Sequence, residues 1–287
     1  MFAITGITGQ VGGVVARKLL AAGQDVRAVV RSAAKGAVWA GQGCAVALAD
    51  MDDAAALTRA FTGCAGVFIL LPPIFDPDAE LSAARAVARA VRLAIESALP
   101  QQVVCLSTIG AQATEFNLLT QLQLLERELA PLATPITFLR PAWYMENAAW
   151  DIAPARDSGR LPSFLQPLEK PVPMVATADV GRVAAELLQE SWSGHRVIEL
   201  AGPTRISPEQ IAALLGRLLG REVRAQAVPR DTWEALFRSQ GMHNPLPRMR
   251  MLDGFNQGWI KFEGDAAQVR KGAVELETVL RGLIERP

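Results

Sequence analysis

The sequence predicts an α/β fold of the doubly wound kind, in which helices cover both faces of a parallel sheet. Short apolar runs recur through the first half of the chain, and segments with helical periodicity separate most of them. The runs are apolar throughout rather than alternating, which is typical of strands buried on both faces. In sheets of this kind, ligands bind at the carboxyl ends of the strands.

The expected elements follow one another in βαβ order through the first half. Strands are expected at residues 2–5, 26–30, 44–48, 66–71, 102–107 and 136–139. Helices are expected at residues 11–22, 52–61, 81–98 and 116–130. This order predicts a parallel sheet covered by helices on both faces.

After Pro141 the pattern becomes less regular. Residues 151–175 contain five prolines and show no periodicity, so we expect an irregular excursion there, and residues 240–260 show no assignable pattern. Ser207 and Pro208 indicate the start of a helix over 207–219. The other expected elements are a helix at 179–189 capped by Thr177 or Asp179, strands at 196–200 and 222–228, and helices at 232–239 and 273–285.

Composition limits the classes of partner. The 287 residues carry 29 lysines and arginines against 29 aspartates and glutamates, so bulk charge favours neither nucleic acid nor an anionic membrane. No apolar run approaches the ~20 residues that span a bilayer, and the N-terminus lacks the basic segment of a signal peptide. We therefore expect a soluble cytoplasmic protein. The three scattered cysteines, Cys44, Cys64 and Cys105, are expected to be buried and reduced.

The strongest motif is a glycine-rich turn, with Gly6, Gly9 and Gly12 in the stretch TGITGQVG between the first strand and the first helix. Gly6 would permit the tight turn, Gly9 the approach of a pyrophosphate to the backbone, and Gly12 close packing of helix on sheet. The helix N-terminus would present N–H groups to the phosphates. The motif therefore predicts a dinucleotide site built from Gly6, Thr8, Gly9, Gln10, Val11 and Gly12.

The end of the second strand bears on the choice of dinucleotide. NAD-selective proteins place an acidic residue there, whereas this chain has Arg31, with Lys35 four residues on. A guanidinium pairs well with a 2′-phosphate, so NADP(H) is favoured over NAD(H). Asp50 and the neighbouring Met51 are candidates to contact the edge of the adenine ring. The alternative is a structural role for this segment, in which Asp52 caps the next helix.

These segments together resemble the NmrA-like proteins, atypical members of the short-chain dehydrogenase/reductase superfamily. The resemblance rests on six stretches besides the turn: VVRS (29–32), ADMDD (49–53), LLPP (70–73), LRPAWYMEN (139–147), ADVGRV (178–183) and ELAGP (199–203). Leu71 and Pro72 join the candidate cofactor contacts through it. The resemblance covers most of the chain and is weakest over 240–272.

The resemblance implies a Rossmann-type domain and a smaller, interleaved C-terminal α/β substrate domain, with the substrate cleft between them. The first is expected over 1–150, with 176–204 returning to it, and the second over 151–175 and 205–287. The resemblance also implies NADP(H) as cofactor. Some members resemble NADPH-dependent quinone oxidoreductases, and others resemble redox sensors that bind a protein partner without turnover.

The usual catalytic pair of the superfamily is missing from the sequence. That pair is a tyrosine four residues before a lysine, but Tyr144 is the only tyrosine and Ala148 follows it at that spacing. The helix at 116–130 has neither residue, and Gln121 or Gln123 stands where NmrA-like proteins often carry a lysine. A sugar-nucleotide epimerase, which needs the tyrosine base, is therefore the weakest hypothesis.

Hydride transfer to a quinone remains open, because that chemistry is mainly the cofactor's. Ser107 and Thr108 end the fifth strand and are candidates for the nicotinamide ribose or substrate, and Ser107 and Tyr144 are the catalytic candidates. The side chains that would line an apolar pocket, with ordinary core as the alternative, are Trp143, Met145, Phe164, Trp233, Met242, Phe255 and Trp259. His195 and His243 are isolated, so no metal site is expected. The lead hypothesis is an NADPH-dependent oxidoreductase of quinones or similar apolar acceptors, and the alternative is an NADP(H)-sensing regulatory protein with a protein partner.

Overall fold

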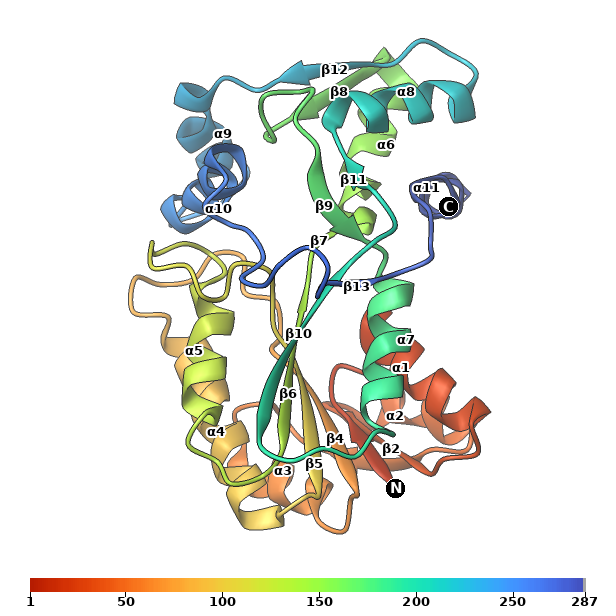
Figure 1. Ribbon diagram of the computed structural model, residues 1–287, viewed down its shortest axis with the longest axis vertical. Helices are drawn as coiled ribbons and strands as arrows, with labels where there is room; N and C mark the ends of the chain where they lie inside the picture. Colours follow the sequence, from red (N-terminus) through yellow and green to blue (C-terminus); the bar gives the residue numbers. More distant parts are fainter. Residues whose placement is uncertain (286–287) are drawn as a thin grey trace. The chain divides into compact units, whose positions relative to one another are not determined.

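The computed structural model describes residues 1–285 and contains a mostly parallel sheet of eight strands (Figure 1). The strand order is β13-β10-β6-β5-β4-β1-β2-β3. Its first-half strands are β1 (Phe2–Ile4), β2 (Val26–Val30), β3 (Ala45–Leu48), β4 (Gly66–Leu70), β5 (Gln102–Leu106) and β6 (Ile136–Pro141). The order 3-2-1-4-5-6 reverses between β1 and β4, which defines the switch point where dinucleotides bind in such sheets. The predicted Rossmann-type fold is confirmed.

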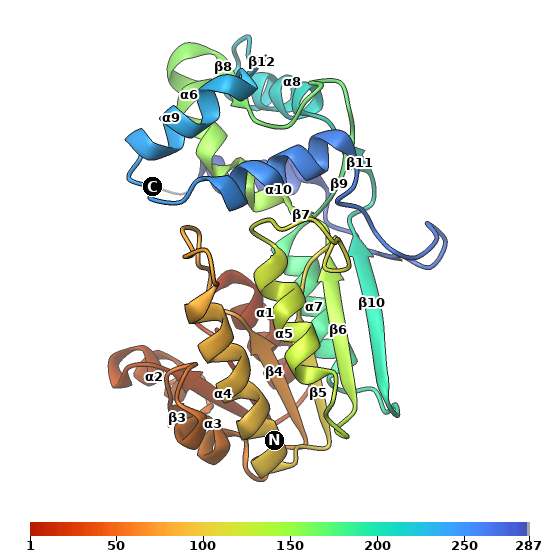
Figure 2. The ribbon, with the colours of Figure 1, turned by 90° about the vertical axis from the view of Figure 1, so that its left-hand side faces the viewer.

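Helices cover both faces of this sheet (Figures 1 and 2). On one face lie α3 (Ala54–Phe61), α4 (Ser82–Ala98) and α5 (Thr120–Leu129), and on the other lie α1 (Gln10–Ala21) and α7 (Thr177–Leu187). Helix α4 is strongly amphipathic and buries a stripe of alanine, valine and isoleucine. A Cβ on Gly181 of α7 would lie 2.5 Å from the Val14 side chain of α1, so a glycine is what lets these two helices approach.

Strand β3 departs from the expectation that every strand is buried on both faces. It is the edge strand, and Val46 and Leu48 are 40% and 54% exposed. An edge strand has one neighbour only, so part of its apolar surface stays in solvent. The composition of β3 could not reveal its position in the sheet.

The sequence reading missed α2 (Ala33–Ala40), an eight-residue helix that packs against β2 and β3. Its pattern is short and is interrupted by Gly36, which lowers helix propensity. A Cβ on Gly36 would lie 2.6 Å from Val46 Cγ1, so the glycine is required for the contact between helix and sheet.

The chain divides into two compact units, and each unit is built from three separate segments of the sequence. Unit 1 comprises residues 1–111, 119–140 and 180–198, and unit 2 comprises 112–118, 141–179 and 199–285 within the described chain. Residues 141–150, expected in the first domain, therefore belong to unit 2. Strand β10 (His195–Ala201) runs from one unit into the other.

Unit 2 contains two small sheets. The first has the order β11-β9-β7 and the second pairs β12 with β8. The strands of these sheets are β7 (Trp143–Tyr144), β8 (Arg160–Ser163), β9 (Val172–Val175), β11 (Arg205–Ile206) and β12 (Arg224–Ala227). Strand β13 (Arg270–Lys271) instead pairs with β10 in the eight-stranded sheet. The helices are η1 (Met145–Ala148), α6 (Ala149–Ser158), α8 (Pro208–Leu219), η2 (Arg230–Thr232), α9 (Trp233–Ser239), α10 (Leu246–Gln257) and α11 (Leu276–Ile284). The capping box of Ser207 with Gln210 confirms the predicted start of α8.

The irregular excursion expected at 151–175 is wrong, since α6, β8 and β9 lie there. Pro154 sits inside α6, where a proline removes a backbone hydrogen bond and normally interrupts a helix. The helix nevertheless buries Ile152 and Ala155 and packs on β8 and α8. Tertiary packing outweighs local propensity here.

Helix α10 was also missed, although Met249, Leu252 and Phe255 are buried at helical spacing. Two prolines near its start hid this pattern, yet proline is tolerated in the first turn of a helix.

The start of α7 also differs from the expectation, because neither Thr177 nor Asp179 caps it from outside. Thr177 is the first residue of the helix, and its N–H donates to Glu146 Oε1 at 2.9 Å. Asp179 accepts a hydrogen bond from the Val274 N–H at 2.8 Å. The carboxylates of Glu146 and Asp179 therefore each accept a hydrogen bond from a backbone N–H of unit 2.

All three cysteines are buried and free, as predicted. Burial raises the pKa of each thiol, most strongly for Cys105. Within residues 1–285, no helix combines the length and the apolar character that crossing a membrane requires.

We expect Gly36→Ala to destabilise the protein by about 1–3 kcal/mol, because the added methyl would overlap Val46. Alanine alone would favour the helix by up to about 1 kcal/mol, so a loss shows that packing outweighs propensity. Urea denaturation followed by circular dichroism measures the change. Gly41→Ala at the C-cap of the same helix is the control, since its nearest neighbours would lie at 3.6 Å; equal behaviour of the two variants contradicts the packing explanation.

Candidate functional site

The turn between β1 and α1 is closed by its glycines. Gly6 has a φ of +59°, in the left-handed region that favours glycine. The Gly9 N–H donates to the Gly6 carbonyl oxygen at 2.9 Å. A Cβ on Gly12 would lie 2.4 Å from that same oxygen, so α1 can begin against the turn only without a side chain there. The tightest contact at Gly12 is therefore with the turn itself.

Thr5 fixes this turn to the end of β4, and sequence reasoning missed it. Its buried hydroxyl donates to the Phe68 carbonyl at 3.0 Å and accepts from the Leu70 N–H at 2.9 Å. The two strand ends at the switch point are thereby joined through one side chain. Only its position before Gly6 could have marked it.

The outer surface of the turn is formed by Thr8, Gly9 and Gln10, which are exposed, whereas the Val11 side chain is buried. Only the backbone of Val11 is therefore suited to contact a ligand. Helix α1 has no acidic residue in its first turn, and Gly9 supplies no side chain to cap it. Such a helix N-terminus favours an anion through its N–H groups and its dipole.

Two cations follow β2. Arg31 and Lys35 are exposed, and their side chains form no ion pair or hydrogen bond with any described residue. Between them, Ser32 caps α2 by accepting a hydrogen bond from the Lys35 N–H at 3.5 Å. The cap keeps both residues at the carboxyl edge of the sheet, with their charges free for an anionic ligand.

The remaining candidate contacts lie after β3 and β4. Asp50 is exposed and Met51 half-buried at the end of β3. The helix cap that follows is Asp53, which accepts from the Ala56 N–H at 2.9 Å, and not Asp52. After β4, Leu71 is buried and Pro72 half-buried.

Ser107 belongs to a buried polar network in unit 1. Its hydroxyl donates to Glu126 Oε1, and Arg140 holds the same carboxylate through Nε at 2.9 Å and a terminal nitrogen at 2.6 Å. All three residues are less than 10% exposed. The carboxylate thus engages the Ser107 hydroxyl and fixes its direction. Sequence reasoning singled out Ser107 alone, because its partners lie on α5 and β6.

The other candidates near this edge are Thr108 and the two glutamines of α5. Thr108 is half-buried, and its hydroxyl donates to the Ile109 carbonyl at 3.2 Å. Gln121 on α5 is buried and donates to the Ile74 carbonyl at 3.0 Å, while Gln123 is half-buried. Neither glutamine can replace the proton chemistry of a lysine.

Tyr144 lies in unit 2, on β7. Desolvation raises its pKa well above the ordinary tyrosine value, and the charge of Glu146 adds to the shift. The phenol therefore stays protonated at neutral pH. Sequence reasoning missed Asp151, in the first turn of α6, whose pKa is raised to about 7 by burial.

The aromatic and methionine side chains that were predicted to line a pocket divide into two groups. Met145, Trp233 and Phe255 are at most 4% exposed and form core. Trp143, Phe164 and Met242 are only partly buried against the cluster of Trp233, Phe237, Met249 and Leu252. Trp259 is also partly exposed and donates to Gln257. The partly buried members remain available to a ligand.

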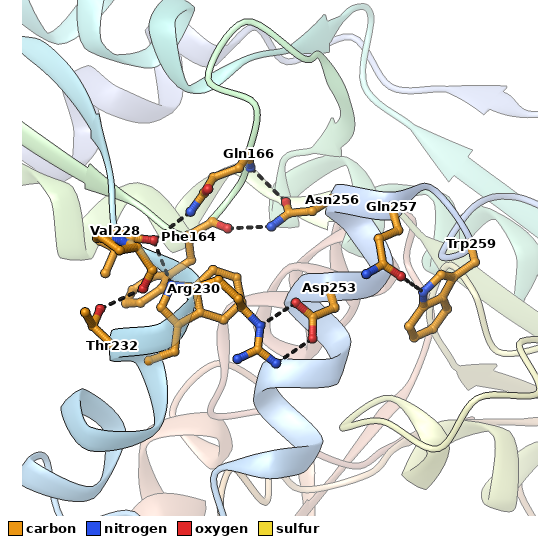
Figure 3. A network of polar contacts seen from close by, with 11 residues as sticks. Phe164, Gln166, Val228, Arg230, Thr232, Asp253, Asn256, Gln257 and Trp259 are labelled. Atoms are coloured by element: carbon orange, nitrogen blue, oxygen red, sulfur yellow. Dashed lines mark hydrogen bonds and ion pairs between the residues drawn. The ribbon is translucent and has the colours of Figure 1, made fainter.

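This cluster is held by polar contacts from α10, which Figure 3 shows. Asn256 accepts from the Gln166 N–H at 2.8 Å and donates to the Phe164 carbonyl at 2.9 Å. Arg230 forms a bidentate ion pair with Asp253, with N···O distances of 2.6 and 2.7 Å. The backbone of Phe164 is therefore fixed relative to α10.

Comparison with known proteins agrees with this architecture. The chain belongs to the NmrA-like family, whose family model matches residues 1–258. It is 28% identical to quinone oxidoreductase 2 of Escherichia coli (strain K12) over 251 residues, covering 87% of this chain and 85% of that protein. It is 32% identical to a (4-alkanoyl-5-oxo-2,5-dihydrofuran-3-yl)methyl phosphate reductase of Streptomyces griseus over 231 residues, covering 80% and 78%.

A solved structure shows the same likeness. The NADPH-dependent quinone oxidoreductase QOR2 of Escherichia coli, complexed with NADPH, superposes with a TM-score of 0.83 at 26% identity. The likeness covers 99% of this chain and 100% of that chain. The predicted resemblance to NmrA-like proteins is confirmed.

Because Arg140 and Glu126 are both buried, we expect Glu126→Ala to cost about 3–5 kcal/mol of unfolding free energy, as it removes the carboxylate that pairs with a buried guanidinium. The control is Glu128→Ala on the same helix, whose partially exposed pair with Arg92 contributes at most about 1 kcal/mol. Urea denaturation measures both. Similar small losses would show that the buried network does not stabilise unit 1.

Proposed function

We propose that the chain is an NADP(H)-dependent oxidoreductase of quinones or similar flat, apolar acceptors. The observation that carries the proposal is the exposed glycine turn at the start of α1, together with two cations after β2 that have no partner among residues 1–285. It is supported by similarity to a quinone oxidoreductase over most of both chains and to its NADPH-bound structure.

The residues of unit 1 fit the parts of NADP(H). The pyrophosphate would lie against the turn formed by Gly6, Thr8, Gly9 and Gln10, where N–H groups favour anions. The 2′-phosphate would pair with Arg31 and Lys35. The remaining proposed contacts of the dinucleotide are Val11 through its backbone, Gly12, Asp50, Met51, Leu71, Pro72, Ser107 and Thr108.

When bound, NADPH supplies the hydride, so the protein needs to orient the acceptor and provide a proton. A quinone that accepts a hydride also takes one proton to become the hydroquinone. Two side chains of unit 2 have suitable chemistry. Tyr144 retains its proton at neutral pH, and the pKa of Asp151, raised to about 7 by burial, suits this carboxyl to proton transfer near neutral pH. Neither role requires the missing tyrosine–lysine pair.

The acceptor itself would lie on the partly buried aromatic surface of unit 2. Trp143 packs edge-on to Phe255 with ring centroids 5.1 Å apart, which fixes its orientation. Phe164 and Met242 offer further apolar surface. Aromatic and thioether side chains bind flat apolar rings well.

Arg31→Asp is expected to raise the dissociation constant for NADPH by roughly 10- to 100-fold, because a charge-assisted contact to the 2′-phosphate is replaced by repulsion. The constant for NADH should change less than about 2-fold, since NADH has no 2′-phosphate. Fluorescence titration measures both. Arg59→Asp is the matched control, because Arg59 is exposed and unpaired among the described residues of unit 1. Equal losses for the two cofactors would show that Arg31 does not contact the 2′-phosphate.

Turnover is tested by loading the protein with NADPH and following the fluorescence of the reduced nicotinamide after quinones are added. We expect the signal to decay faster than in a protein-free control, with one hydroquinone formed for each NADPH oxidised. A signal that persists with every acceptor contradicts the enzyme proposal. That outcome would favour a protein that senses NADP(H) and acts through a partner.

A further inference from the structure

Arg248 on α10 carries a positive charge without a counterion. Its guanidinium stacks over the Phe237 ring at 4.3 Å and lies 6.0 Å from the Phe164 ring. Among residues 1–285 it forms no ion pair and donates no hydrogen bond. Five N–H donors in a fixed planar group are therefore unused, although the residue is half-buried.

This arrangement is costly without a ligand. Partial burial disfavours the charged form and lowers the pKa of Arg248, and no carboxylate compensates. The guanidinium also lies in the first turn of α10, where the helix dipole opposes a cation. Stacking on an aromatic ring offsets only part of these costs.

The neighbouring carboxylate is already occupied. Asp253 is the only acidic residue in α10, and both of its oxygens accept hydrogen bonds from Arg230. The ion pair fixes η2 to α10, and Asn256 fixes Phe164 to the same helix. The rings beneath Arg248 are thus held by contacts that do not involve its charge, and the guanidinium is left available for another partner.

We infer that Arg248 binds an anionic group on the acceptor, so that the substrate class is an aromatic acceptor carrying a sulfonate, carboxylate or phosphate. The planar, two-pronged geometry of a guanidinium matches these anions. The partly buried Phe164, Trp143 and Met242 supply the apolar surface for the ring of the same molecule. This inference rests on the proposed reductase function and names the acceptor that it takes.

Two matched quinones test the inference: 1,2-naphthoquinone-4-sulfonate and uncharged 1,2-naphthoquinone. Arg248→Met keeps an aliphatic stem against Phe237 and removes the charge. We expect it to lower kcat/KM for the sulfonated quinone by roughly 10- to 100-fold, and for the uncharged quinone by less than about 2-fold. Because each variant is compared with wild type on the same quinone, the different reduction potentials of the two quinones cancel.

Two further variants separate charge from packing. Arg248→Lys retains the charge but loses the planar fork and the stacking on Phe237, so it should recover only part of the activity with the sulfonated quinone. Arg250→Met removes an exposed charge from the same helix and should leave both quinones unaffected. Equal losses on both quinones with Arg248→Met, or the same selective loss with Arg250→Met, would overturn the inference.

A binding measurement distinguishes this inference from the proposed function. The fluorescence of 1-anilinonaphthalene-8-sulfonate and of its uncharged analogue N-phenyl-1-naphthylamine is titrated with wild type and with Arg248→Met. Selective loss of the sulfonate probe supports an anion site at Arg248 even if no quinone is reduced, in which case the reductase proposal alone fails. Normal reduction of both quinones by every variant, with unchanged probe binding, overturns the anion site and leaves the reductase proposal standing.

Discussion

Helix α1 begins where it does because its third residue has no side chain. Gly12 rests against the carbonyl oxygen of Gly6, and that oxygen also receives the N–H of Gly9. Thr5 ties the same turn to β4 across the switch point. The Gly6 carbonyl and the Thr5 hydroxyl thus fix the turn in place. The turn then sets the direction of the α1 dipole and leaves the backbone of Thr8 and Gly9 exposed. Everything proposed about the cofactor depends on this small set of contacts.

The second organising feature is the use of carboxylates to hold backbone and loops. Glu146 binds the start of α7, Asp179 binds the Val274 N–H, and Glu199 accepts from the backbone of Glu263 and Gly264. Glu126 in unit 1 joins Ser107 to Arg140. These four carboxylates are thus engaged by other groups of the protein.

Sequence predicted what depends on neighbours along the chain. The parallel strands, the glycine turn and the Ser207 cap follow from local pattern, and all are present. Elements that depend on distant contacts were missed: α2 needs Gly36 to clear Val46, and α6 keeps Pro154 because its apolar residues are buried. The network around Glu126 and the isolated charge of Arg248 could not be predicted either. Both depend on contacts between side chains that are far apart in the sequence, and the spacing of residues along the chain does not reveal such contacts.

The burial of the cysteines has a consequence for a protein proposed to handle quinones. Quinones are electrophiles that alkylate thiolates by conjugate addition, and the reactive species is the thiolate rather than the thiol. Cys44, Cys64 and Cys105 are all buried, and burial raises the pKa of each. The charge of Glu126 raises that of Cys105 further. The three thiols are therefore hidden from the acceptor, which disfavours conjugate addition to cysteine by the compounds the chain is proposed to reduce.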